Sequence, residues 1–380
     1  MLEASSGSHA TPQTPAVETM VARLLENSPP ATQVLRLPPP VREAPAATAA
    51  FAGLSYASPE EPGVSRRRSG RGFVYERADG SRVKDRATLA RIRALAIPPA
   101  WRRVWISPDP NGHLQAMGYD EKGRRQYRYH ARFRELREHV KYQRLIAFAE
   151  TLPLIRARVE ADMARPGRRQ VLATVVHLLE TTMIRVGNRS YARDNHSFGL
   201  TTLEPRHLQI AGTRLRFSFT GKSGKAWRLD IRDKRIVRIL KTCQELPGQS
   251  LFRYVDEVGE AQSITSVDVN DYLREISGAD FTAKDFRTWN GTVLAATELA
   301  QAPAPQTARA GKHSLAVAIR KVAAQLHNTP AVCRACYVHP AVVDAFLAGD
   351  LRLDLEGQPA NPWLSAAEMA VLSFVRARAK

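Results

Sequence analysis

Four separated segments of the chain carry side chains that could together cleave a phosphodiester bond. Arg185 lies in TTMIRVGNRSYARDN, Lys222 in FTGKSGKAW, Arg287 in FTAKDFRTWNGT and Tyr337 in LHNTPAVCRACYVHP. Cleavage without a metal ion needs an in-line nucleophile, cations for the charge on the phosphoryl oxygens and a proton for the leaving oxygen. Tyrosine, arginine and lysine side chains can supply these three functions, provided that a folded domain brings the segments together.

The charge balance of the chain indicates a polyanionic partner. The 380 residues include 56 lysines and arginines against 37 acidic residues, for a formal net charge of +19. Such a surface binds phosphate backbones by counterion release, and it could also bind an anionic membrane. No apolar run approaches the roughly 18 residues that a membrane-spanning helix needs. We therefore expect a nucleic acid as the partner, and no membrane.

Cysteine usage and the N-terminus favour a cytoplasmic protein without a bound metal. Three cysteines in a chain of this length do not suggest a disulfide framework. Cys333 and Cys336 form a single CxxC, but no second pair stands at zinc-site spacing, so we interpret both as packing residues. The first ten residues, MLEASSGSHA, lack the basic and apolar regions of a secretory signal.

The segments between these motifs predict an α+β fold in three parts. Residues 1–65 are rich in Ala, Pro, Ser and Thr, and we expect a disordered tail. Residues 66–130 alternate in short stretches around Asp79-Gly80 and Asn111-Gly112, which predicts a small β-rich domain with one helix near 86–95. Residues 131–380 form a mainly α-helical domain with an inserted β-hairpin, TRLRFSFT-GKSGK-AWRLDI.

Local signals set the expected ends of several helices. An apolar face that begins at Val171 predicts a buried helix with Arg185 at its far end. Ser266 is the expected N-cap of VDVNDYLREIS, and Gly278 its C-cap. Ser365 and Glu368 form the capping-box pattern that predicts a last helix.

In this order, the four chemical segments resemble the catalytic motifs of type IB topoisomerases, especially the compact poxviral and bacterial members. GRRQYRYH and LPGQSLFRY extend the resemblance over roughly Gly72 to Leu351. The resemblance implies a monomeric enzyme that relaxes supercoiled DNA without ATP, metal or any other cofactor. It also implies single-strand cleavage through a 3′-phosphotyrosyl intermediate, strand rotation and religation, with the 66–130 domain clamping DNA.

The resemblance assigns a role to each chemical residue. Tyr337 resembles the nucleophile, Arg185 and Arg287 the arginines that hold the non-bridging oxygens, and Lys222 the hairpin lysine that protonates the 5′ oxygen. Where the poxviral pattern has histidine before Thr-Pro, this chain has Asn328, which can donate a hydrogen bond but cannot be cationic. His327, one place earlier, is the alternative helper. The motif favours Asn328.

The resemblance also extends to DNA contacts outside the chemical residues. They lie in GRRQYRYH, in the segment that follows Arg185 and on the hairpin. For the residues of GRRQYRYH, the alternative is that they form the exposed basic face of a half-buried strand without contacting DNA. The candidate DNA contacts are Arg125, Tyr127, Tyr129, Asn188, Arg189, Tyr191 and Lys225.

Three other functions agree less well with the residues of this chain. Gly221 to Ser223 contain the GKS of a P-loop, but Arg216 stands where its first glycine belongs and no helix follows, so no nucleotide is expected. A tyrosine site-specific recombinase usually has histidine three residues before the second arginine, where this chain has Lys284. A non-catalytic DNA-binding protein of the same fold would need no competent set of chemical residues, and all five positions are competent here.

Overall fold

The computed structural model describes residues 45–359 and 361–378. The first 44 residues of the expected 1–65 tail lie outside this description. Residues 45–65 are folded: helix α3 covers Pro45–Phe51 and strand β1 begins at Val64. Ala49, Ala52 and Leu54 form a small core with Phe133. The prediction of a disordered tail is therefore wrong for residues 45–65, because their few apolar side chains make enough contacts to order the backbone.

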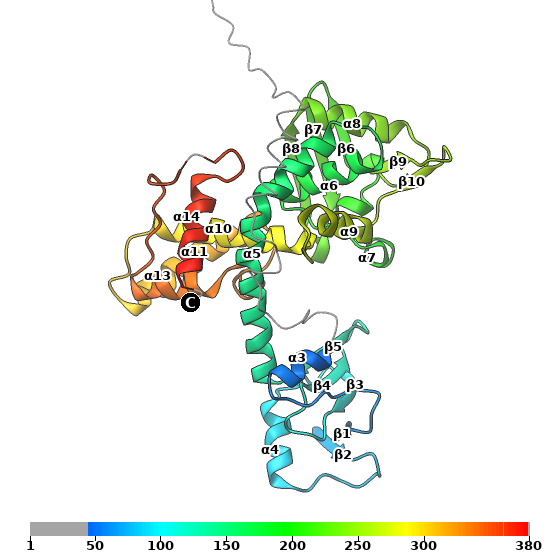
Figure 1. Ribbon diagram of the computed structural model, residues 1–380. Helices are drawn as coiled ribbons and strands as arrows, with labels where there is room; N and C mark the ends of the chain where they lie inside the picture. The colour runs from blue at the N-terminus through cyan, green and yellow to red at the C-terminus, as the bar shows by residue number, and fades with distance from the viewer. Residues whose placement is uncertain (1–44, 360, 379–380) are drawn as a thin grey trace, which may run out of the picture. The chain divides into compact units, whose positions relative to one another are not determined.

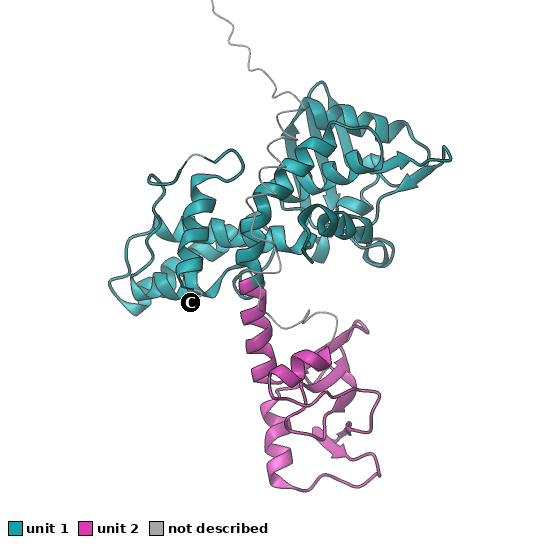
Figure 2. Cartoon of the chain, in the orientation of Figure 1, with its two compact units in different colours: residues 1–35, 144–380 teal, residues 36–143 magenta. Residues whose placement is uncertain are grey.

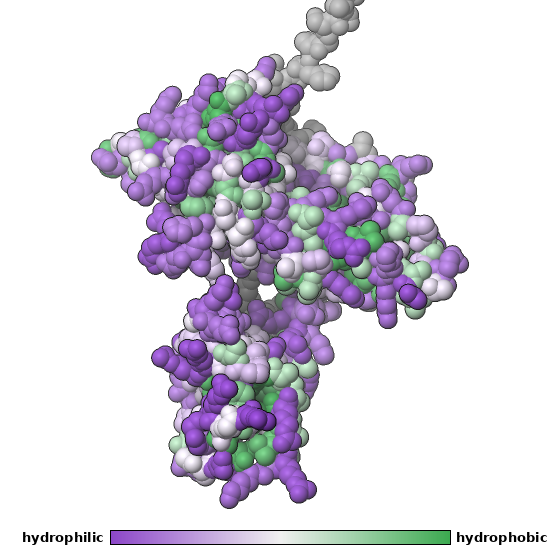
Figure 3. All heavy atoms as spheres, turned by 180° about the vertical axis from the view of Figure 1, so that it is seen from behind, coloured by the Kyte–Doolittle hydropathy of each residue, from purple (hydrophilic) through white to green (hydrophobic). Residues whose placement is uncertain are grey.

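The chain divides into two compact units after Gln143, which Figure 2 colours separately. Helix α5, Ala131–Met163, starts in the first of them and continues into the second. Figure 3 shows a face on which hydrophilic side chains predominate in both units.

The unit that ends at Gln143 is built on an antiparallel five-stranded sheet in the order β2-β1-β3-β4-β5. Helix α4, Arg86–Ala94, confirms the expected helix, and the carboxylate of its N-cap Asp85 accepts from the backbone N–H groups of Ala87 and Thr88. The core contains Ile92, Val104 and Ile106. The strands are β1 Val64–Ser69, β2 Gly72–Glu76, β3 Arg102–Ile106, β4 Leu114–Tyr119 and β5 Arg125–Tyr129.

The unit that begins at Arg144 is mainly helical, as expected, and carries the predicted hairpin as β7 Arg214–Thr220 and β8 Ala226–Arg232. Strand β6, Leu208–Ala211, which was not predicted, pairs with β7 to make a three-stranded sheet. A second hairpin pairs β9 Arg253–Val255 with β10 Ala261–Ser263. The helices are α6 Arg168–Thr182, α7 Arg189–Asn195, α8 Lys234–Glu245, α9 Ser266–Ser277, α10 Ala283–Ala300, α11 Ala308–Gln325, α12 Pro330–Tyr337, α13 Pro340–Ala348 and α14 Ala366–Ala377.

Helix α10 is the central helix of this unit, packed against α6, α11, α12, α13 and α14 (Figure 1). Its fully buried Trp289 donates through Nε1 to Glu368 Oε1 on α14, at 3.2 Å. Arg156 of α5 pairs with the same carboxylate at 2.7 Å and with Glu180 of α6 at 2.6 Å. A buried polar network thus locks α5, α6, α10 and α14 together, since each of its charges has a partner.

The helix-end signals were confirmed in part. Ser365 and Glu368 form the expected capping box, and Gly278 ends α9 in the left-handed region with φ 67°. The predicted N-cap Ser266 was wrong by one residue, because Thr265 Oγ1 accepts from Asp268 N at 3.3 Å. Helix α6 ends at Thr182, short of Arg185, because Met183 adopts a left-handed conformation with φ 57°.

None of the described helices is by itself long and apolar enough to cross a membrane; only α12 and α13 taken together reach that composition, and they are bent by 106°.

Candidate active site

Arg287 is a buried cation on the central helix α10, with 3% of its surface exposed. Its Nη2 donates to the carbonyl oxygen of Leu326 at 2.7 Å, and its Nη1 donates to that of Met183. Burial, with the nearby charge of Arg185, lowers the pKa of Arg287 to about 10. Among the described residues this guanidinium pairs with no carboxylate, so its charge stays available to an anionic ligand.

Tyr337, the last residue of α12, lies beside this cation. The guanidinium carbon of Arg287 is 5.2 Å from the centroid of the Tyr337 ring. The backbone below is held by α10: Thr292 Oγ1 donates to the Tyr337 carbonyl at 3.3 Å and accepts from His339 N at 3.1 Å. A Cβ at Gly291 would lie 2.6 Å from that carbonyl, so only glycine allows α12 to approach so closely. The ring is partly exposed.

Arg185 and Asn328 are 143 residues apart in the sequence, and their side chains meet. Arg185 follows α6 in a segment whose backbone carbonyl accepts from Leu200 N at 2.9 Å, and its Nη2 donates to Asn328 Oδ1. The Nδ2 of Asn328 and the Nε of Arg287 are buried, with no hydrogen-bond partner in the described structure. Buried donors of this kind are normally satisfied, so an anion that accepted from both would complete the site.

The segment Leu326–Asn328, which we term the strap, ends helix α11. Asn328 N donates to Ala323 O at 2.8 Å, and His327 takes the left-handed position with φ 49°. The His327 ring stacks on Trp227 of β8 with centroids 3.8 Å apart and planes 20° apart. The strap therefore separates the two helper candidates: Asn328 contacts Arg185, whereas His327 packs on the sheet.

The hairpin lysines are exposed on both sides of a tight turn. Ser223 and Gly224, at φ 65° and 71°, form its centre between Lys222 and Lys225. Lys222 Nζ lies 5.6 Å from the centroid of the Tyr191 ring. Within the described residues, no contact joins Lys222 to Arg185, Arg287, Asn328 or Tyr337. The charge of Lys225 does reach the strap, where it helps to lower the pKa of His327.

The candidate DNA contacts after Arg185 form the start of α7. Asn188 is its N-cap, and its Oδ1 accepts from Tyr191 N at 3.1 Å. Arg189 is exposed, and Tyr191 keeps 43% of its surface exposed. All three side chains reach solvent, while the side-chain Oδ1 of Asn188 caps the start of α7.

The candidates on β5 belong to the other unit and differ from one another. Tyr127 is 41% exposed and stacks on Tyr129 with centroids 5.9 Å apart. Tyr129 packs in turn on Phe133 at 5.4 Å, and burial raises its pKa. Arg125 donates through Nε to Tyr119 Oη at 3.1 Å. Tyr127 is thus presented to solvent, whereas Tyr129 helps to build the small core around α3.

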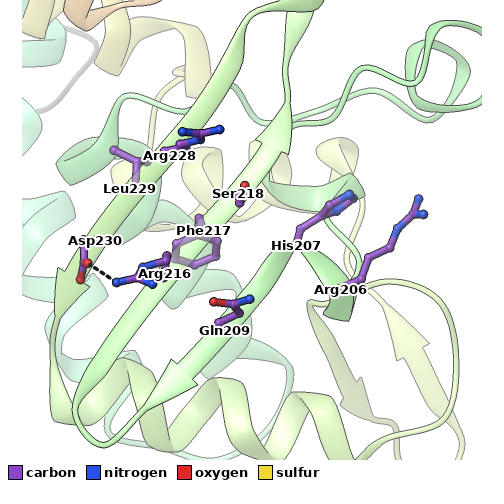
Figure 4. Close-up of a pocket in the computed structure, with 9 residues that line it drawn as sticks. All are labelled: Arg206, His207, Gln209, Arg216, Phe217, Ser218, Arg228, Leu229 and Asp230. Atoms are coloured by element: carbon purple, nitrogen blue, oxygen red, sulfur yellow. Dashed lines mark ion pairs between the residues drawn. The ribbon is translucent and has the colours of Figure 1, made fainter.

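A groove on the solvent face of β6, β7 and β8 was missed by the sequence analysis (Figure 4). It measures about 410 Å³ and is lined by Arg206, Arg216 and Arg228. Arg216 lies 3.6 Å from Asp230, whereas Arg228 forms no ion pair with any described residue. The alternation RLRFSF and WRLDIR was the available signal, since it puts the charged residues of both strands on one face.

The described part of the chain contains no group of side chains that could hold a metal ion. No three histidine, cysteine, aspartate or glutamate side chains form a cluster within residues 45–359 and 361–378. Cys333 is buried and Cys336 half-buried, and neither forms a disulfide bond. Burial raises the pKa of Cys333 to about 11.

Comparison with known proteins identifies the family. Residues 130–347, which contain all five chemical residues, match the family model of the eukaryotic DNA topoisomerase I catalytic core, and residues 72–120 match that of the bacterial DNA topoisomerase IB N-terminal domain. DNA topoisomerase 1B of Acanthamoeba polyphaga mimivirus is 33% identical over 285 residues, 73% of this chain and 85% of the relative. DNA topoisomerase 1B of Vaccinia virus (strain Copenhagen) is 22% identical over 233 residues, 60% of this chain and 71% of the relative. The chain therefore belongs to the type IB DNA topoisomerases, in the class that includes the poxvirus-like and bacterial enzymes.

Proposed function

We propose that this protein relaxes supercoiled duplex DNA by cleaving and rejoining one strand through Tyr337. The observation that carries the proposal is the contact of side chains from three separate segments: Arg185 with Asn328, and Arg287 with Tyr337. Neither arginine is neutralised by a carboxylate within the described structure. Two such cations and a hydroxyl nucleophile at one partly open site suit an attack on a phosphodiester.

In cleavage, Tyr337 Oη attacks the phosphorus, and the bond to the 5′ oxygen breaks. The DNA 3′ end becomes a phosphotyrosine, the tyrosine proton passes to solvent water, and the 5′ oxygen takes up a proton and leaves as a hydroxyl. Arg287, beside the ring, stabilises the charge that develops around the attacking oxygen. Arg185 and Arg287 hold the non-bridging oxygens, and the free Nδ2 of Asn328 donates a further hydrogen bond.

We assign the proton to Lys222, on the exposed turn between β7 and β8. In the described conformation its ammonium lies over Tyr191, so the turn must move towards the 5′ oxygen when DNA is bound. A short turn with two left-handed residues and exposed side chains is able to make such a motion. Delivery of the acid would then depend on docked DNA.

After cleavage, the 5′ end rotates about the intact strand and attacks the phosphotyrosine in the reverse reaction. The phosphotyrosyl bond conserves the energy of the broken bond, so neither ATP nor another cofactor is required. Supercoils of both signs should relax. One chain carries the whole set of chemical residues, which supports a monomeric enzyme, and we place it on cytoplasmic DNA.

The proposal is tested by trapping the intermediate. A supercoiled plasmid is incubated with the protein in excess EDTA without ATP, stopped with detergent and separated by denaturing electrophoresis, and the adduct is mapped by peptide mass spectrometry. The expected adduct links Tyr337 to a DNA 3′ phosphate. An adduct at another residue, or relaxation that stops in EDTA, would overturn the proposal.

A further inference from the structure

The stack of His327 on Trp227 joins two parts of the site that have different tasks. On one side, the backbone carbonyl of Leu326 accepts from Arg287, and the side-chain Oδ1 of Asn328 accepts from Arg185. On the other side, Trp227 is the second residue of strand β8, which follows the hairpin turn. His327 is the one strap residue whose side chain contacts the hairpin strands through a ring stack.

The backbone of His327 is in a strained conformation. Its φ of 49° lies in the left-handed region, where a residue with a Cβ is less stable than in the ordinary helical conformation. Glycine is the usual occupant of this place at a helix end. A histidine here needs a compensating contact, and the stack with centroids 3.8 Å apart provides one.

Trp227 transmits the position of that ring to the turn. Only 2% of Trp227 is exposed, and its indole stacks on Phe219 of β7 with planes 3° apart. A Cβ on Gly221 would lie 2.7 Å from the indole, so the turn begins in direct contact with it. Gly221 N donates to Lys225 O at 2.7 Å, which closes the turn that carries Lys222.

The imidazole of His327 behaves as a packing group and not as another cation for phosphate. Burial lowers its pKa, and the charges of Arg287, Arg185 and Lys225 lower it further. Its ring faces the indole, while the hydrogen-bonding side chain that reaches Arg185 comes from Asn328.

We infer that His327 is a positioning residue: its stack on Trp227 fixes the base of the acid-bearing hairpin against the strap that holds both arginines. Without the stack, the arginines keep their strap contacts, but the hairpin loses its ring contact with the strap and Lys222 is positioned less firmly. The ring thus acts through Lys222 on protonation of the 5′ oxygen. This inference rests on the proposed function of Lys222 and Tyr337.

The test begins with His327→Gly, which suits the left-handed backbone and therefore preserves the Leu326 carbonyl and Asn328 while it removes the ring. Cleavage is measured in single turnovers on a short duplex at saturating enzyme. We expect a roughly three- to tenfold slower cleavage, the size expected for one aromatic pair, with unchanged DNA affinity. His327→Phe retains a ring and should restore the rate. His196, which is also left-handed but is exposed, lies in the same unit, so His196→Gly is the matched control and should behave like the wild type.

Two further measurements show through which group the ring acts. On a duplex whose 5′ bridging oxygen is sulfur, the leaving thiolate needs no proton, so His327→Gly should recover the wild-type rate. In a Lys222→Ala background, His327→Gly should cause no further loss, because both changes remove the same function.

The contrary outcomes are distinct. A slow His327→Phe would mean that the ring nitrogens act on the phosphate, and an equal defect of His327→Gly on sulfur would mean that the ring acts through the arginines; either result overturns the inference. Wild-type cleavage by His327→Gly does so too. Failure of the proposed function appears separately, as a wild-type protein that forms no adduct at Tyr337.

Discussion

The guanidinium carbon of Arg287 lies 5.2 Å from the ring centroid of Tyr337, although the two residues belong to different helices, α10 and α12. The approach depends on Gly291, which lets the Tyr337 carbonyl come within reach of Thr292. The cation is held rigidly because two backbone carbonyls accept from it. A fixed positive charge next to a partly exposed phenol is a preorganised electrostatic site, which needs little rearrangement when charge develops.

Tyr337→Phe is expected to abolish covalent adduct formation and plasmid relaxation, because only the attacking oxygen is lost. The ring, its contact with Arg287 and the backbone bonds to Thr292 remain. DNA affinity, measured by fluorescence anisotropy on a duplex, should stay near that of the wild type. Substantial relaxation by this variant would remove Tyr337 as the nucleophile.

Arg287→Lys is expected to lower the cleavage rate by about 10²–10³-fold, the usual cost of one lost donor to a developing oxyanion. Lysine retains the charge but cannot reproduce the planar fork that reaches Leu326 O and Met183 O. Single-turnover cleavage measures the effect, and thermal unfolding checks that the fold survives. A loss of less than tenfold in the cleavage rate, which is about 1.4 kcal/mol of activation free energy, would show that Arg287 only packs α10.

Lys222→Ala and Lys225→Ala separate the two lysines of the turn. If Lys222 is the acid, its loss slows cleavage of normal DNA but not of DNA with a 5′ bridging sulfur, because a thiolate leaves without a proton. Lys225→Ala should affect both substrates alike, through binding only. Arg185→Ala is the comparison, since a residue that holds non-bridging oxygens gains little from sulfur. The opposite pattern, recovery of Lys225→Ala on sulfur, would transfer the role of acid to Lys225.

Arg228→Ala should reduce the salt dependence of DNA binding if the groove on the solvent face of β6, β7 and β8 binds phosphates. Each phosphate contact contributes about 0.9 to the slope of log affinity against log salt, so loss of one contact should flatten the slope by that amount. Arg216→Ala is the matched control, because Arg216 is 3.6 Å from Asp230 and is already partly neutralised. Identical slopes in wild type and Arg228→Ala would exclude the groove from the DNA footprint.

Acid should destabilise the protein partly through His327. Burial and the nearby cations lower its pKa, so the unfolded chain takes up the proton more readily than the folded one. The contribution to stability is therefore fully present above the unfolded pKa of about 6.5 and is lost as pH falls below it. The melting temperature of His327→Phe should consequently fall less than that of the wild type between pH 7.5 and pH 5. His113, His177 and His207, whose pKa values are also lowered, account for the loss that remains. A larger acid loss in the variant would contradict this.

The sequence by itself indicated the family through its motifs and predicted the α+β class, because both depend on residue types and their order along the chain. The alternation of TRLRFSFT and AWRLDI predicted the β7–β8 hairpin, and the pattern of Ser365 and Glu368 predicted the start of α14. These signals are local: a strand period, a turn and a cap each lie within a few residues. Net charge likewise needs no fold to indicate a polyanion.

Only the tertiary structure decided which groups meet. Asn328 and His327 are neighbours in sequence, yet one contacts Arg185 and the other stacks on Trp227, because a left-handed residue at the end of α11 turns their side chains apart. The composition of residues 45–65 predicted a disordered tail, but in the structure Ala49 and Ala52 pack against Phe133 and order this segment. In both cases the deciding contact joins residues far apart in the chain, and no local period or cap encodes the packing of one element on another.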